Sequence, residues 1–249
     1  MSKSEDYIAE LKKLKDWDEY LMKNSNLPSP RSNLELLAAA VELGNKETFL
    51  KFLKITPEIA GVNDPGEFLC TIGVAGLGKI IAEEKSSTHL FVNLCDFARD
   101  PRWRVREGVA MALQYIGKKD MHFLFQSTSE WAQSDLFVQR ALVAGLCEPA
   151  LLRNSEDALK VLEIVFRITE NLKKHNSERK TEAYRVLKKA LSYGLSVAIV
   201  FSSEKGKQYF ENLMNEKDPD IRSILKENLS KQRLIRMDSV WVNSMLTQF

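Results

Sequence analysis

The sequence predicts an all-α protein in which antiparallel helix pairs stack along the chain as an α-solenoid. Apolar residues recur at helical spacing through most of the chain, and no sustained strand–helix alternation competes with this pattern. The segment 105–113 also aligns with 138–146, and the Asp-Pro sequence at Asp100 returns at Asp218. Such spacings are typical of helical-pair repeats, which are roughly 33 to 47 residues long.

The stretch 100–117 is the clearest of the predicted helices. Asp100 and Pro101 mark its start, because Asp can cap free N–H groups and Pro suits the first helical position. Gly117 is expected to end it. An apolar stripe at helical spacing predicts a buried face, which consists of Val105, Val109, Ala112, Leu113 and Ile116.

Further helices are expected on both sides of this stretch, each bounded by capping residues, Gly or Pro. Before it, helices are predicted at 5–23, 34–43, 46–54, 68–84 and 89–97, with a linker at 24–30. After it, helices are predicted at 121–131, 136–146, 157–172, 177–194, 204–214 and 221–229. The β-branched run 196–201 leaves a strand open, although a helix start is the preferred interpretation. The apolar tail 238–249 is expected to dock as a cap on the last helix pair.

Composition and charge favour a soluble cytoplasmic protein with a single domain of residues 1–249. The formal net charge is +2, so charge alone does not indicate a binder of polyanions. Three scattered cysteines form no CxxC pair, and no His or Cys cluster has metal-ligand spacing, so neither a metal nor another cofactor is predicted. The polar N-terminus lacks signal-peptide character, and no apolar run approaches the ~20 residues of a membrane span. Membrane contact is therefore not expected, and the oligomeric state is left open.

The glycine-rich segment 73–79 has the spacing of a phosphate-binding P-loop as far as Lys79. Ile80 follows where a P-loop requires Ser or Thr to hold magnesium, and no βαβ pattern surrounds the segment. The simpler interpretation is that these small residues allow two helices to approach closely.

Basic residues outnumber acidic residues between 167 and 189. A run of this kind is typical of a solvated helix face. The alternative is a phosphate-contacting patch, formed together with the arginines at 102–106 if the solenoid brings the two stretches together.

Trp103 and Glu107 lie one helical turn apart, away from the apolar stripe of their helix. One interpretation is structural, with the indole packed on a neighbouring repeat and the carboxylate paired with an arginine. The other is a ligand-facing wall, because the second helices of a paired-helix solenoid line its concave side. In the repeat alignment Glu107, Arg140 and Tyr184 occupy the same position of successive second helices, which predicts a polar row on that side.

The repeat signature, Asp-Pro followed by Val-Arg, resembles HEAT repeats, and the chain is most similar to bacterial HEAT-repeat proteins of unassigned function. Residues 100–141 also resemble the middle of the bacterial HEAT-like DNA alkylation-repair glycosylases. Those enzymes carry a Trp followed four residues later by a catalytic carboxylate, usually Asp, and here the pair is Trp103 and Glu107. The match continues in the next repeat through Trp131, Ser134, Asp135, Phe137, Gln139, Arg140 and Ala141.

Two functions follow from these expectations. The preferred one is a non-enzymatic HEAT-like scaffold that binds a protein partner on its concave face. The alternative, implied by the glycosylase resemblance, is excision of alkylated purines from DNA, with Glu107 as the catalytic carboxylate and DNA held on a basic concave face. Under either function, the expected ligand-binding residues are Trp103, Arg102, Arg106, Arg140 and Tyr184.

Overall fold

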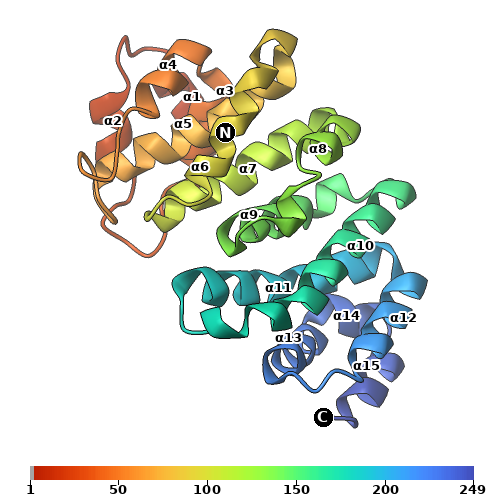
Figure 1. Cartoon of the computed structure of the whole chain (residues 1–249). Coiled ribbons are helices and arrows are strands. Elements are labelled where there is room, and N and C mark those ends of the chain that lie inside the picture. Colours follow the sequence, from red (N-terminus) through yellow and green to blue (C-terminus); the bar gives the residue numbers. More distant parts are fainter. Residues whose placement is uncertain (1–2) are drawn as a thin grey trace. The chain divides into compact units, whose positions relative to one another are not determined.

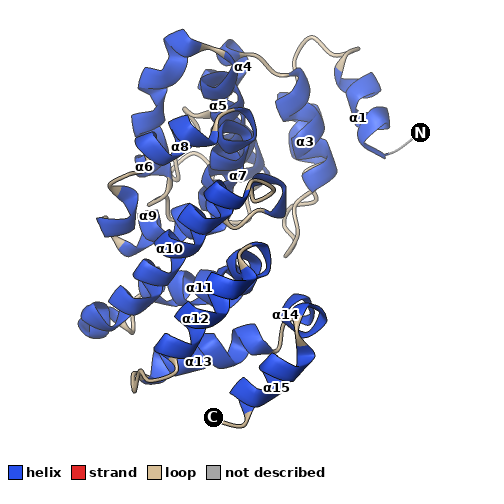
Figure 2. Cartoon of the chain, turned by 90° about the vertical axis from the view of Figure 1, so that its right-hand side faces the viewer, coloured by secondary structure: helices blue, strands red, loops and turns tan. Residues whose placement is uncertain are grey.

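The computed structural model describes residues 3–249, and every regular element within that range is a helix (Figures 1 and 2). Helices account for 75% of the chain, and no strand occurs among the described residues, so the predicted all-α class is confirmed. The β-branched run 196–201 belongs to a helix. The sequence predicts a single domain. In the structure the chain divides into two compact units, Met1–Asp120 and Met121–Phe249.

The described part of the first unit contains seven α-helices and one 3-10 helix. They are α1 (Lys3–Leu11), α2 (Asp18–Lys23), α3 (Leu34–Leu43), α4 (Lys46–Phe52), α5 (Pro65–Glu83), η1 (Lys85–Phe91), α6 (Val92–Phe97) and α7 (Trp103–Lys119). The single helix expected at 5–23 is therefore two helices. The indole N–H of Trp17 donates to the carbonyl of Leu11, the last residue of α1, at 3.0 Å, which holds the chain in the bend between them.

Helix α5 forms the centre of the first unit and packs most extensively on α7 (Figure 1). Its glycines permit this approach. A Cβ atom at Gly78 would lie 2.3 Å from the Cα atom of Ala112, and one at Gly76 would lie 2.4 Å from the ring of Phe49. The segment that mimics a P-loop is thus a close-packing surface in the core, as the simpler interpretation held.

Helix α5 contradicts the expectation that no apolar segment approaches the length of a membrane span. Its 19 residues have the length and mean hydropathy of a spanning helix, but 83% of the segment is buried inside the protein. A buried core helix of a soluble protein passes the same test of length and composition.

Helix α7 buries the predicted apolar stripe completely, from Val105 through Ile116. It begins two residues later than its Asp-Pro sequence, at Trp103, and continues past Gly117 to Lys119. Asp100 does not cap free N–H groups of the helix in the usual way. Its carboxylate instead accepts the backbone N–H of Arg102 at 2.7 Å and also binds that residue's side chain.

The second unit is built from eight α-helices and short 3-10 segments. The α-helices are α8 (Met121–Ser127), α9 (Leu136–Leu146), α10 (Ser155–Asn171), α11 (Glu182–Phe201), α12 (Ser203–Leu213), α13 (Pro219–Leu229), α14 (Gln232–Met237) and α15 (Ser239–Leu246). The 3-10 segments are η2 (Trp131–Gln133), η3 (Pro149–Leu151) and η4 (Leu172–Glu178). Asp218 caps α13 by accepting the N–H groups of Asp220 and Ile221, as its Asp-Pro sequence predicts.

The sequence predicts that this helix ends at Gly194, but α11 continues to Phe201. Gly194 serves packing instead, since a Cβ atom there would lie 2.9 Å from Val143 Cγ1 on α9. The buried side chain of Asn228 joins α13 to α11. Its amide donates to the carbonyl of Leu191 at 3.0 Å, and its oxygen accepts the N–H of Ser196 at 2.8 Å.

The C-terminal tail docks on the second unit as α15. Trp241 and Met245 are buried, the Trp241 ring packs edge-on against Phe210 at 5.2 Å, and its indole N–H donates to Glu211 at 2.8 Å. Val240, by contrast, was expected to join this contact and is 79% exposed. The tail therefore covers the unit with one face only.

Candidate ligand-binding site

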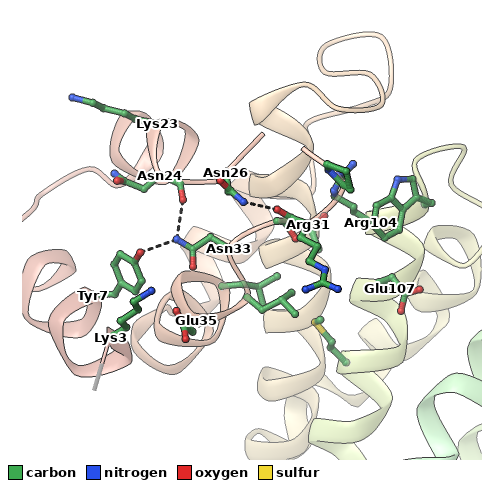
Figure 3. Close-up of a pocket in the computed structure, with 17 residues that line it drawn as sticks. Lys3, Tyr7, Lys23, Asn24, Asn26, Arg31, Asn33, Glu35, Arg104 and Glu107 are labelled. Carbon is green, nitrogen blue, oxygen red and sulfur yellow. Dashed lines mark hydrogen bonds between the residues drawn. The ribbon is translucent and has the colours of Figure 1, made fainter. Parts of the chain in front are cut away.

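The first unit contains a pocket of about 1050 Å³ between the N-terminal helices and the start of α7 (Figure 3). Residues from five regions line it: α1 and α2, the loop 24–33, the first turn of α3, Thr71 on α5, and one side of α7. The lining comprises Lys3, Tyr7, Lys23, Asn24, Asn26, Pro30, Arg31, Ser32, Asn33, Leu34, Glu35, Leu37, Thr71, Trp103, Arg104, Glu107 and Met111.

Helix α7 contributes the two residues that the sequence predicts as a ligand-facing wall. Trp103 and Glu107 both line the pocket, and Trp103 is 40% exposed. Their side chains point away from the core because the apolar stripe of α7, one face further round the helix, packs into the unit. The first and second turns of α7 therefore present an indole and a carboxylate together to the pocket.

Arg104 holds the start of α7 against α5. Its guanidinium lies 4.3 Å from the centroid of the Trp103 ring and donates at 3.0 Å to the carboxylate of Glu67, which is fully buried in the first turn of α5. The same group donates to Asn63 Oδ1 at 2.9 Å and to the carbonyl of Ser29 in the pocket loop. One buried side chain thus connects the Trp103 wall, the core and the loop.

Glu67 also takes the place of a capping side chain for α7. Arg102, the residue before the helix, makes no side-chain cap, and the carboxylate of Glu67 accepts the backbone N–H of Arg104 at 3.4 Å. It accepts the N–H of Asn63 at 2.8 Å as well. A carboxylate at a helix N-terminus interacts favourably with the helix dipole, so Glu67 stabilises the end of α7 that carries Trp103.

The loop 24–33 is held in one conformation by its own polar groups. Asn26 adopts a positive φ of 65°, a region that Asn tolerates better than most residues, and its side chain donates to the carbonyl of Arg31 at 2.8 Å. Ser29 accepts the N–H of Arg31 at 3.2 Å. Asn33 caps α3 and donates to Tyr7 Oη at 2.9 Å. The loop is therefore an ordered wall, whereas the sequence presents residues 24–30 as a linker.

Arg31 extends from this loop into the pocket and faces the side on which Glu107 lies (Figure 3). Its guanidinium makes no hydrogen bond or ion pair with a residue in the described part of the chain, unlike that of Arg104. Lys3 and Lys23, also in the lining, are likewise exposed and without an ion pair to any described residue. Three cations thus border the pocket with their charge available.

An apolar strip also belongs to the lining. It consists of Leu34, Leu37, Met111 and Trp103, all of which line the pocket. Leu34 is 57% exposed and Trp103 40% exposed, which is high for large hydrophobic side chains. The pocket therefore offers an apolar contact surface with charged groups at its edges.

Two further predicted ligand-binding residues, Arg102 and Arg106, lie in the core instead of the pocket. Arg102 is 1% exposed and uses all five of its N–H donors: on Asp100, on the carbonyls of Ile55 and Ala60, and on Cys70. Burial opposes its charge, but the hydrogen bonds that Arg102 donates to Asp100 outweigh burial and raise the pKa of Arg102. Arg106 is 3% exposed and donates to the carbonyl of Asp100 at 2.6 Å. Neither contributes to a basic surface, because both guanidinium groups are buried. A buried guanidinium needs several fixed acceptors, and backbone carbonyls supply some of them here.

Arg140 and Tyr184 belong to the second unit, and Glu107 belongs to the first. Tyr184 is buried, and its hydroxyl donates to Asp220 at 2.9 Å. Burial raises the pKa of Tyr184 to about 12. Arg140 is half-buried on α9. The polar row of Glu107, Arg140 and Tyr184 stays a prediction. Tyr184 is buried, and its hydroxyl hydrogen-bonds to Asp220.

The basic run 167–189 divides into paired and solvated residues. Arg179 and Lys188 form ion pairs with Asp220, and Lys173 forms one with Glu216. Arg167, Lys174, Lys180, Arg185 and Lys189 are exposed. The run is thus largely a helix surface with local ion pairs.

Within the described residues, no group of three or more His, Cys, Asp or Glu side chains could hold a metal ion.

Comparisons of the chain with known protein families, with curated protein sequences and with solved structures find no match. The resemblance to HEAT repeats and to the alkylation-repair glycosylases therefore stays a prediction that depends on the residues quoted for it.

Sequence reasoning missed the pocket loop and its cations. Asn24, Asn26, Pro30 and Arg31 lie in a stretch rich in Asn, Ser and Pro, and such composition is read as a helix break. The available signal was the Asn33 cap of α3, which requires the preceding residues to approach the helix. That signal gives no indication that Arg31 and Trp103 border the same pocket.

Proposed function

We propose that the protein is a binding scaffold of the HEAT-like helical-repeat type, and that the pocket of its first unit holds a segment of a protein partner. One observation carries the proposal: Trp103, an exposed indole at the start of α7, and the exposed Leu34 both line a pocket with ordered polar walls. Exposed Trp residues in such settings are frequent sources of binding energy at protein interfaces.

The composition of the pocket favours a polypeptide over a nucleic acid. A polypeptide offers apolar side chains for the apolar strip and backbone amides for the polar walls. Nucleic acids bind through phosphate-contacting cations, and here Arg102 and Arg106 are withdrawn into the core while Glu35 and Glu107 border the pocket.

The test is selection of binders from a random peptide display library on the full chain. Selected peptides should lose about 30-fold or more in affinity on Trp103→Ala, because a central Trp contributes about 2 kcal/mol or more at such sites. Val92→Ala is the matched control, since Val92 is an exposed residue of α6 outside the pocket. Peptides that bind wild type and Trp103→Ala equally would place the binding surface elsewhere and refute the proposal.

A second function is favoured by the position of Glu107. Trp103 and Glu107 line the same pocket, which is the pairing that the glycosylase resemblance requires. In that function Glu107 would stabilise the positive sugar that develops as an alkylated base departs, and single groups of this kind commonly contribute a few kcal/mol to catalysis.

The assay that separates the two functions is release of N-methylated purine from duplex DNA by excess protein at low salt. A glycosylase would release base as wild type, and Glu107→Gln would abolish release while the fold and DNA affinity persist. The scaffold proposal predicts no release by wild type. It also predicts little DNA binding, whereas a DNA-binding protein would show affinity that falls steeply with salt.

A further inference from the structure

We infer that the segment held in the pocket is acidic, with an aliphatic or aromatic anchor residue next to a carboxylate that Arg31 binds. This inference rests on the proposed function and names the chemistry of the partner. Its basis is the geometry of Arg31, whose backbone is fixed by the loop while its guanidinium extends into the pocket without a partner among the described residues (Figure 3).

The loop gives Arg31 a defined position. Its carbonyl accepts from the side chains of Asn26 and Ser29 at 2.8 Å and 3.2 Å, and its N–H donates to Ser29 at 3.2 Å. The carbonyl of Ser29 in turn binds the buried Arg104. An arginine on a fixed backbone loses less freedom when it binds a carboxylate, and the guanidinium fork matches a carboxylate in two parallel hydrogen bonds.

The charges around the pocket favour an acidic occupant. Lys3, Lys23 and Arg31 have no ion pair with a described residue, and the fourth cation of the lining, Arg104, is neutralised by Glu67. Glu35 and Glu107 oppose them in the lining. Three cations without an ion pair to a described residue favour negative charge in the occupant, and their small number gives little attraction for a long polyanion.

The apolar strip sets the second feature of the segment. Leu34 is 57% exposed and Trp103 40% exposed, and both line the same pocket as Arg31. An apolar side chain seated on Leu34 or Trp103 would remove part of this surface from water, which supplies affinity. The neighbouring carboxylate bound by Arg31 would then supply specificity. The expected motif is thus an apolar residue within one or two positions of Asp or Glu.

The experiment uses peptides selected on the wild-type full chain and measures their affinity for charge variants. Arg31→Glu should weaken binding by roughly 10-fold to 100-fold, as expected for loss of a hydrogen-bonded charge pair, and Arg31→Lys should weaken it less. A peptide whose acidic residue is replaced by Lys should bind Arg31→Glu at least about tenfold better than wild type. The matched control is Lys54→Glu, because Lys54 is exposed in the same unit and lies outside the pocket.

The outcomes separate this inference from the proposed function. If Trp103→Ala removes binding while Arg31→Glu does not, and the selected peptides carry no excess of Asp or Glu, the acidic segment is refuted and the pocket stands. If neither variant changes binding, the pocket itself is refuted. Binding of single-stranded or duplex DNA in preference to every peptide would overturn the assignment to a polypeptide. Arg31 is exposed, so its variants should melt as wild type does, and this is checked by circular dichroism.

Discussion

Replacing Glu67 by Gln should destabilise the first unit far more than the loss of an ordinary surface ion pair. The substitution keeps the shape of the side chain but removes the charge that compensates Arg104. Both side chains are buried, at 0% and 2% exposure. Removing one partner of a buried ion pair costs about 3–5 kcal/mol, because the remaining charge is left uncompensated.

Two features place the expected loss in the upper part of that range. Arg104 already has one buried donor, Nε, without a hydrogen-bond partner among the described residues, so it depends on the remaining contacts. The Gln amide would also direct an N–H group toward donors that now share a carboxylate, including the backbone N–H groups of Asn63 and Arg104. An unsatisfied buried donor costs about 1–3 kcal/mol.

The assay is urea denaturation of the full chain, followed by far-UV circular dichroism. Hydrogen exchange of peptides from α5 and α7 locates the loss within the first unit. The double variant Glu67→Leu/Arg104→Met is the informative comparison, since replacing both charges by apolar groups of similar volume is often neutral. We expect it to be more stable than Glu67→Gln alone. A loss below about 1 kcal/mol for Glu67→Gln, the size found for exposed pairs, would refute the reasoning.

Two other predictions concern buried groups. Burial raises the pKa of Cys70 to about 11 and that of Cys147 to about 12, so at pH 8 both thiols should resist alkylation until the chain is unfolded, as measured by mass spectrometry of each site. Rapid labelling of either thiol in the folded protein would contradict this. Trp241→Ala should lower the free energy of unfolding by about 3 kcal/mol, while Val240→Ala changes it by less than about 0.5 kcal/mol. Equal effects would mean that the tail does not dock through Trp241.

Sequence pattern predicted those parts of the fold that depend on local periodicity. The stripe of α7 is buried as expected because residues such as Val105 and Val109 recur with the helical period and have no polar alternative. Helix ends were harder to predict. Gly117 and Gly194 lie inside helices, since the packing of Gly194 against Val143 outweighs the tendency of glycine to end a helix.

The candidate site was predicted only in part, for a physical reason. Trp103 and Glu107 lie on one helix, so their spacing alone indicates that they share a face. Arg31 reaches the same pocket through tertiary contacts of its loop, which no local pattern encodes. The burial of Arg102 and Arg106 likewise depends on acceptors distant in sequence, such as the carbonyls of Ile55 and Ala60, which bind Arg102. A cluster of arginines in sequence therefore indicates neither a basic surface nor a core network.

The ion-pair cluster around Asp220 should make the second unit sensitive to acid. Burial acts to raise the pKa of Asp220, but hydrogen bonds from Lys188 and Tyr184 outweigh burial, and the net pKa lies below the ordinary 3.8. A carboxyl whose pKa is lower in the folded than in the unfolded state binds fewer protons when folded. It therefore contributes stability above about pH 4, and this contribution is lost as the pH falls through the folded value.

Asp220→Asn tests this origin directly, because it leaves Lys188 and the hydroxyl of Tyr184 without the carboxylate they share at 2.6 Å and 2.9 Å. The free energy of unfolding is measured for wild type and variant from pH 6 down to pH 2.5. We expect the variant to be less stable at pH 6 and the difference between the two proteins to shrink below about pH 4, as the pH falls from the unfolded pKa of Asp220 through its lower folded pKa. Tyr184→Phe should reduce the same acid dependence without abolishing it, since Lys188 still binds Asp220. A difference between wild type and Asp220→Asn that stays constant over this range would show that the carboxylate charge does not stabilise the cluster, and that Asp220 acts only through packing and neutral hydrogen bonds.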